Sequence, residues 1–277
     1  MIRRIAALAF LTIASAAAHA ADQTFTRTIN LRDRLDLAIV SRAGDIRFSQ
    51  GPAGRLRITG RIRANDWHAS DDRLRDIAAS PPIQQSGSVV RIGSAEELTH
   101  VVIDYEIEAP ADSIVQASSG SGDIFDEGVG LTAHFNTGSG SVHATGLLGS
   151  VNISSNNGDI EVEQSGQGEV KAVSNTGNLE LRNLHGALRA ATNAGSIKVS
   201  GAPTGDWSVQ TGKGDIELTL GRAAGCAIDA QTGDGLVHTD LKVESGSTFD
   251  PRHLAGTING GGHNVVIQAG QGEIRIH

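Results

Sequence analysis

The sequence predicts an all-β protein whose main part is a single-stranded parallel β-helix, a solenoid with 18–19 residues per coil that we expect to be right-handed. Glycine accounts for 35 of the 277 residues. A short phrase centred on glycine recurs at nearly constant spacing, and apolar residues alternate with polar ones before and after it. Six prolines are too few for collagen, and a hydrophobic content of 39% can supply a packed core, which excludes disorder.

The first twenty residues have the features of a secretory signal peptide. An arginine pair precedes an apolar stretch over residues 5–18, and Ala18-His19-Ala20 supplies the small residues of a cleavage site. We therefore expect residues 1–20 to be removed and the mature chain to be exported to the periplasm, the cell surface or the medium. No later segment has the length of a transmembrane helix, so we expect no membrane-spanning segment.

Residues 21–110 are expected to form a β-rich capping portion at one open end of the solenoid, because a terminal unit must cover the exposed core. Within it, residues 70–79 predict a short amphipathic helix that has Ser70 as its N-cap and ends before Pro81. Alternation of arginine with apolar residues places four arginines on the exposed side of one strand: Arg55, Arg57, Arg61 and Arg63. Charged side chains of this kind typically prevent an edge strand from pairing with another chain, and a ligand-binding patch is the alternative interpretation.

Residues 111–277 carry the repeats of the expected β-helix. The phrase consists of glycine, a small or acidic residue, an aliphatic residue, any residue, and often a second aliphatic residue. Its copies begin at Gly122, Gly140, Gly158, Gly177, Gly195, Gly214, Gly235 and Gly272. An earlier copy begins at Gly44, and a looser one at Gly256 divides the long last interval. Two short strands and a bend in each copy cannot bury a face alone, so the copies must stack on one another.

Alignment on the glycine predicts two columns of equivalent side chains inside the stack. The aliphatic core column lies two residues after the glycine and comprises Ile124, Val142, Ile160, Leu179, Ile197, Ile216, Val237 and Ile274. The hydroxyl column lies three residues before it and comprises Ser119, Thr137, Ser155, Ser174, Thr192, Thr211 and Thr232. We expect these hydroxyls to bond to one another and to the backbone of the corner.

A third apolar point occurs in some coils, at Val129, Leu147, Leu184 and Ala202. It favours a triangular cross-section with one irregular side, and a flat solenoid of two sheets remains the alternative. A left-handed hexapeptide helix would need an aliphatic residue every six positions, which the two-strand spacing does not give.

No residue pattern in the chain predicts a catalytic, cofactor or metal site. Asp123, Asp159 and Asp215 follow corner glycines, and serine or asparagine fills the same column in other coils, which is typical of turn formers. Asp123 and Asp159 would lie about 10 Å apart, at or beyond the upper end of the range for an inverting glycosidase. His143 and His238 share a column but are separated by five coils. The lone Cys226 excludes a disulfide framework and any site that needs several cysteines.

The net charge of the chain limits which partners it can bind. A formal net charge of −8 would repel nucleic acid, so we expect none to bind. The sequence names no partner: an envelope protein, a glycan and a second copy of the chain all remain open. Light scattering over a range of concentrations would test self-association.

Several phrases resemble one known family. They are SGSGDI at residues 119–124, NNGDIEV at 156–162, NTGNLEL at 175–181, NAGSIKV at 193–199, and the closing GTINGGG and GEIRI. Together with the signal peptide and the arginine-rich portion, they are similar to the bacterial β-strand-repeat "putative adhesin" proteins, a family of largely unknown function. The resemblance implies an exported, non-enzymatic envelope or surface protein that acts as a binding or structural scaffold. A glycan-active β-helix enzyme, of the polysaccharide lyase or hydrolase type, is the alternative.

Overall fold

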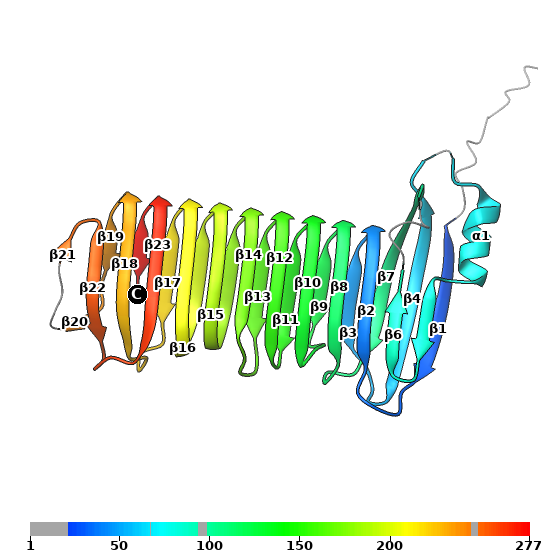
Figure 1. Ribbon diagram of the computed structural model, residues 1–277, viewed down its shortest axis with the longest axis horizontal. Coiled ribbons are helices and arrows are strands. Elements are labelled where there is room, and N and C mark those ends of the chain that lie inside the picture. The colour runs from blue at the N-terminus through cyan, green and yellow to red at the C-terminus, as the bar shows by residue number, and fades with distance from the viewer. Residues whose placement is uncertain (1–21, 67, 94–98, 245–248) are drawn as a thin grey trace, which may run out of the picture.

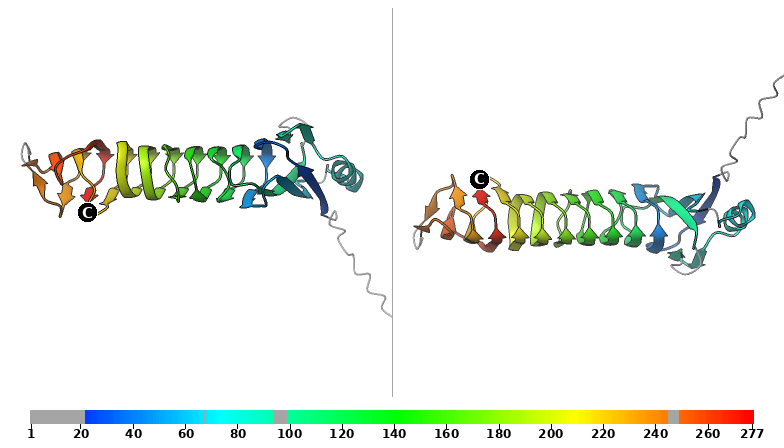
Figure 2. Two further views of the ribbon diagram at one scale, coloured as in Figure 1. Left: turned by 90° about the horizontal axis from the view of Figure 1, so that it is seen from below. Right: turned by 90° about the horizontal axis from the view of Figure 1, so that it is seen from above.

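The computed structural model describes residues 22–66, 68–93, 99–244 and 249–277. The predicted signal peptide, residues 1–20, lies outside the described residues. The chain forms an elongated stack of strands in two layers, with one short helix beside its N-terminal end (Figures 1 and 2). The prediction of an all-β, solenoid-like fold with one helix is therefore confirmed for the part of the chain that the structure describes.

The first layer faces the viewer in Figure 1, and all of its strands pair in parallel. In spatial order they are β2 (Asp36–Ala43), β8 (Ile114–Ser121), β10 (Thr132–Ser139), β12 (Ser150–Asn157), β14 (Val170–Thr176), β15 (Leu179–Ala194), β16 (Ile197–Lys213), β23 (His263–Gln271) and β18 (Cys226–Asp234). The second halves of the long strands β15 and β16 belong to this layer.

The second layer lies behind the first and is also parallel. In spatial order it contains β3 (Ile46–Gln50), β9 (Ile124–Glu127), β11 (Val142–Leu147), β13 (Ile160–Gln164), the first halves of β15 and β16, β17 (Ile216–Leu220), β24 (Ile274–Ile276) and β19 (Val237–Thr239). The corner glycines stand between a strand of one layer and the next strand of the other, which is where the chain reverses direction.

The aliphatic column of the sequence lies in the interior of the second layer. The strand register places Val142 against both Ile124 and Ile160, and the contact continues from coil to coil. The eight members are all buried: Ile124, Val142, Ile160, Leu179, Ile197, Ile216, Val237 and Ile274. Ile46 extends the column in the N-terminal direction, because it pairs with Ile124. Equivalent apolar side chains thus pack on one another along the whole stack, which removes them from water.

The N-terminal end of the stack is closed by strands that turn antiparallel. They are β1 (Gln23–Asn30), β4 (Arg55–Ala64), β5 (Ile83–Ser86), β6 (Val89–Ile92) and β7 (Val101–Ala109). β7 continues the second layer beside β3 in parallel, then pairs antiparallel with β4, which in turn pairs antiparallel with β1. β6 continues the first layer beside β2 in parallel, and β5 pairs antiparallel with β6.

The helix α1 (Asp71–Ala79) packs beside β1 and β4 at this end. The Ser70 hydroxyl accepts a hydrogen bond from the Arg73 amide, as expected for an N-cap, and Leu74 is buried. The helix ends at Ala79, and Ser80 is its C-cap, one residue before Pro81. Both ends of the predicted helix are thus explained by local sequence.

The order of the coils differs from the order of the chain at both ends. Strands β2 and β3 stack on β8 and β9, so residues 36–50 lie in the parallel stack although the sequence analysis assigned them to the capping portion 21–110. At the other end, β23 and β24 are inserted between β16–β17 and β18–β19. At the two ends, therefore, coils that are adjacent in the stack are not successive in the chain. The division at residue 110 into a cap and a repeat region stays a prediction.

The loose repeat at Gly256 forms a covering strand instead of a coil. β22 (His253–Ile258) pairs antiparallel with β18, and the two short strands β20 (Val243–Glu244) and β21 (Phe249–Asp250) pair antiparallel with β22. An antiparallel strand on the last coil occupies backbone groups that would otherwise be open to pairing with another chain. The looser phrase around Gly256 therefore belongs to a covering strand and not to a coil of the stack.

Stacking requires glycine at the corners, and Gly214 provides a test. Its φ is +141°, and a Cβ there would overlap the carbonyl oxygen of Gly195 in the adjacent coil. Because that neighbour is backbone and cannot rotate away, we expect Gly214→Ala to lower the free energy of unfolding by about 3 kcal/mol or more. Urea denaturation followed by circular dichroism would measure the loss.

Gly87 supplies the matched control. Its φ is also positive, at +62°, but a Cβ there would have no neighbour within 4 Å. Gly87→Ala should therefore cost only the backbone strain, about 1 kcal/mol. Equal losses in the two variants would contradict the role of close stacking at the corners.

Candidate functional site

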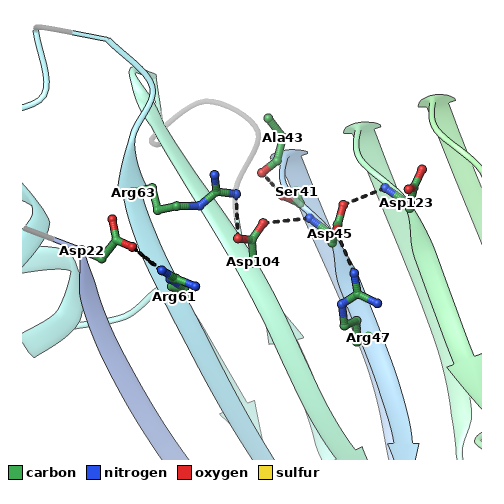
Figure 3. Close-up of polar contacts among 9 residues, drawn as sticks. All are labelled: Asp22, Ser41, Ala43, Asp45, Arg47, Arg61, Arg63, Asp104 and Asp123. Atoms are coloured by element: carbon green, nitrogen blue, oxygen red, sulfur yellow. Dashed lines mark hydrogen bonds and ion pairs between the residues drawn. The ribbon is translucent and has the colours of Figure 1, made fainter.

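The aspartates that follow the corner glycines hold neighbouring coils together. The Asp45 carboxylate accepts a hydrogen bond from the Asp123 amide at 3.1 Å (Figure 3). The Asp123 carboxylate in turn accepts one from the Ser141 amide at 2.7 Å. Asp159 and Asp215 bond in the same way to amides of the next coil in the stack. Each carboxylate thus satisfies a backbone donor at the corner, which accounts for this column without a catalytic role.

The exposed arginines of β4 are largely engaged in ion pairs. Arg61 pairs with Asp22 and Arg63 with Asp104, each at 2.6 Å, and Asp104 also accepts a hydrogen bond from the Asp45 amide (Figure 3). Arg57 lies 3.6 Å from Glu108. These pairs are substantially exposed and contribute little to stability. They do, however, neutralise three of the four arginines that the sequence offered as an alternative ligand patch, Arg57, Arg61 and Arg63.

The hydroxyl column lies just inside the corner, where most of its members bond to backbone. Its members are all buried: Ser119, Thr137, Ser155, Ser174, Thr192, Thr211 and Thr232. Six of them donate to the carbonyl oxygen of a corner glycine in the adjacent coil, at 2.8–3.2 Å. The Ser119 hydroxyl has no partner among the described residues. The column therefore bonds to backbone and not from hydroxyl to hydroxyl.

A groove of about 950 Å³ runs along the outside of this corner. It crosses the carboxyl ends of seven strands, β10, β12, β14, β15, β16, β23 and β18, at the upper edge of the stack in Figure 1. Its lining consists of serine, threonine, asparagine, glutamine, alanine, valine and glycine residues. No charged and no aromatic side chain is among the lining residues, although the chain as a whole carries a net charge of −8.

Three consecutive coils present an asparagine to the groove, at positions 156, 175 and 193. All three side chains are exposed, and their amides make no hydrogen bond with the rest of the described chain. An amide carries both a donor and an acceptor, so each can bind a hydroxyl group of a ligand. These three asparagines were not among the residues predicted to form a site. The signal was present, because asparagine directly follows the hydroxyl column in three successive repeats.

A second row of outward side chains crosses the other layer. The Arg47 guanidinium lies 3.9 Å from the centre of the Phe125 ring, and Phe125 stacks on His143 with ring centres 5.2 Å apart. Glu161 accepts from His143 at 3.2 Å and from Arg182 at 2.6 Å, and these hydrogen bonds lower the pKa of its carboxyl group. Because these groups pair with one another, the row offers fewer unpaired polar groups than the groove.

The lone cysteine provides no further candidate site. Cys226 is buried, and burial raises the pKa of its thiol. Within the described residues, the chain contains no helix with the length and apolarity needed to cross a membrane.

The fold defines a class of protein, a solenoid-like β-repeat protein. Its coils turn at corner glycines, where hydroxyl and carboxylate side chains form hydrogen bonds with the backbone of the adjacent coil. Residues 93–277 match the Toastrack DUF4097 family. The chain belongs to this family. The resemblance of its repeats to "putative adhesin" proteins of unknown function is confirmed.

Solved structures that match this chain carry the same description. A "putative adhesin" from Bacteroides fragilis NCTC 9343 has 14% sequence identity, covers 93% of this chain and 99% of its own, and gives a TM-score of 0.52. Another from Parabacteroides distasonis ATCC 8503 has 10% identity, covers 92% of this chain and 97% of its own, and gives a TM-score of 0.37. At 14% identity, the first of these likenesses shows the fold alone. No curated protein matches the chain.

Proposed function

We propose that the chain is an exported, non-enzymatic surface or envelope protein that binds an extended, uncharged glycan along the corner groove. The observation that carries the proposal is the continuous lining of neutral hydroxyl and amide side chains across seven strands. Export rests on the predicted signal peptide, residues 1–20, and the description of structural neighbours as "putative adhesin" proteins agrees with a binding role.

The dimensions of the groove suit a linear polymer. Six steps between seven adjacent strands span about 29 Å at the usual strand spacing of about 4.8 Å. Each of the seven strands contributes one asparagine or glutamine side chain to the groove, so a ligand with a regular repeat could contact an amide in every coil. We further propose that the stack is a right-handed parallel β-helix, because the two-strand spacing of the repeat does not fit a left-handed hexapeptide helix.

The chemistry of the lining favours a neutral glycan over other polymers. A polyanion would need arginine or lysine, and the lining has neither. An extended peptide usually adds to a free sheet edge, but this groove crosses the strands instead of following one. Sugar hydroxyl groups match the paired donor and acceptor of each asparagine amide.

A glycan array tests the proposal. The purified mature chain should bind neutral linear glycans, and the double variant Asn156→Ala, Asn175→Ala should lose at least about tenfold in affinity, since each lost hydrogen bond is worth about 1 kcal/mol. The matched control is the double variant Gln116→Ala, Asn152→Ala. These two amides lie on β8 and β12 and do not line the groove.

Two results would contradict the proposal. The first is a folded chain that binds no neutral glycan, or that binds one equally well in the groove and control variants. The second is turnover of a polysaccharide that Asp159→Asn abolishes, which would instead support a glycan-active enzyme.

A further inference from the structure

Asp66, His68 and His100 form a side-chain cluster at the N-terminal end of the stack, away from the groove. Asp66 and His68 follow β4, and His100 directly precedes β7. These two strands pair antiparallel up to Ala64 and Val101, so their ends bring the cluster together from positions more than thirty residues apart. These three residues could not be grouped from the sequence, because no local spacing connects His100 to the Asp-x-His pattern.

Two imidazole nitrogens converge on the two oxygens of one carboxylate. The Nδ1 atom of His68 lies 3.2 Å from Oδ1 of Asp66, and the Nδ1 atom of His100 lies 2.6 Å from Oδ2. The two imidazole rings are 4.9 Å apart between their centres. One ligand atom from each residue lies within 4.8 Å of the other two.

The backbone holds this arrangement from both sides. The Asn65 amide donates to the His100 carbonyl at 2.8 Å, and the His68 amide donates to Oδ1 of Asp66 at 2.8 Å. His100 has a φ of +71°, a left-handed conformation that is uncommon outside glycine. Residues held in such a conformation are concentrated at functional sites, because the surrounding structure must compensate for the strain.

We propose that Asp66, His68 and His100 bind a divalent transition-metal ion, for which Zn²⁺ is the probe. Zinc takes imidazole nitrogen and carboxylate oxygen at about 2.0–2.2 Å, which places tetrahedral ligands about 3.3 Å from one another. The His68 to Asp66 separation already has this value, and the His100 to Asp66 separation must open by less than about 1 Å.

The ligand set distinguishes between metals. Two nitrogen ligands and one oxygen favour zinc, copper or nickel over magnesium and calcium, which prefer oxygen alone. A pocket of about 270 Å³ borders Asp66 and His100, so a water molecule has room to complete the coordination. The cluster is partly exposed, which gives a metal ion a direct route from solvent.

Calorimetric titration of the tag-free mature chain with Zn²⁺ tests the site. We expect one ion per chain, Cu²⁺ binding more tightly than Zn²⁺, and no competition from Mg²⁺. His100→Gln should weaken Zn²⁺ binding more than about 100-fold, because loss of an outer-shell partner alone costs about 10–100-fold. Circular dichroism of the metal-free variants would verify that they fold.

His253→Gln is the matched control. His253 lies 2.8 Å from Asp229, so it is also a histidine in contact with a carboxylate, but among the described residues no second imidazole completes a three-ligand set there. This variant should bind Zn²⁺ as the parent chain does. If the tag-free chain binds no Zn²⁺, or if His100→Gln and His253→Gln bind it equally, the cluster is an ordinary set of hydrogen bonds.

Discussion

Ile160→Asp is expected to unfold much of the stack. Ile160 is buried between Val142 and Leu179 of the adjacent coils, so the substitution removes an aliphatic contact on both sides and leaves a carboxyl group without a partner. Burial of an unpaired charge costs several kcal/mol, and the lost apolar contact adds about 1.5–3 kcal/mol. The sum is comparable with the whole stability of a typical domain, about 5–15 kcal/mol. Thermal unfolding followed by circular dichroism would measure the effect.

Arg189→Asp is the control for this variant. Arg189 lies on β15 with its side chain exposed on the outside of the first layer, so an aspartate there stays in water. Its effect on stability should be within about 0.5 kcal/mol. If Ile160→Asp had the same melting temperature as the parent chain, the interior placement of the aliphatic column would be refuted.

Asp126 makes the stability of the protein depend on pH. Its side chain is buried in the second layer, and burial raises the pKa of its carboxyl group to about 8, with repulsion from Glu127 adding to the rise. A hydrogen bond from the Val129 amide, at 2.9 Å, acts in the opposite direction but does not offset burial. The Oδ2 atom has no hydrogen-bond partner among the described residues. We therefore expect the folded protein to hold a proton on Asp126 at neutral pH.

The direction of the pH dependence follows from the pKa of Asp126 in the folded and in the unfolded chain. An unfolded aspartate has a pKa of about 3.9, so between about pH 4 and pH 8 the folded state retains a proton that the unfolded state releases. The contribution of Asp126 to the free energy of unfolding must then fall as pH rises through this range, by up to about 1.4 kcal/mol for each pH unit. Above about pH 8 the contribution should level off.

Asp126→Asn removes this dependence. The amide is uncharged and keeps an oxygen that can accept from the Val129 amide, so other groups titrate as before. We expect the variant to resemble the parent chain near pH 4 and to be more stable by several kcal/mol near pH 8. Urea denaturation of both proteins from pH 4 to pH 9 would measure the difference. Parallel stability curves over that range would show that the carboxyl group does not titrate as proposed.

The sequence determined the repeating part of the fold. Each coil repeats one local pattern, in which a glycine permits the corner, an aspartate or asparagine bonds to it, and an aliphatic residue two positions later faces the interior. Since neighbouring coils in the central stack are also neighbours in the chain, the spacing between Gly122 and Gly214 was enough to predict which residues meet. The same reasoning found the helix at Asp71–Ala79, because Ser70 and Pro81 are local signals.

Only the tertiary structure decided the arrangement of the ends and the positions of the candidate sites. The insertion of β23 and β24 between earlier coils depends on pairing across a long stretch of chain, and any coil with the same pattern satisfies the same hydrogen bonds. The groove is a property of seven coils together, and the cluster of Asp66, His68 and His100 joins two loops that are distant in sequence. A repeat specifies what lies beside each residue in the regular stack, but its periodicity carries no information about where the repeat stops or what gathers there.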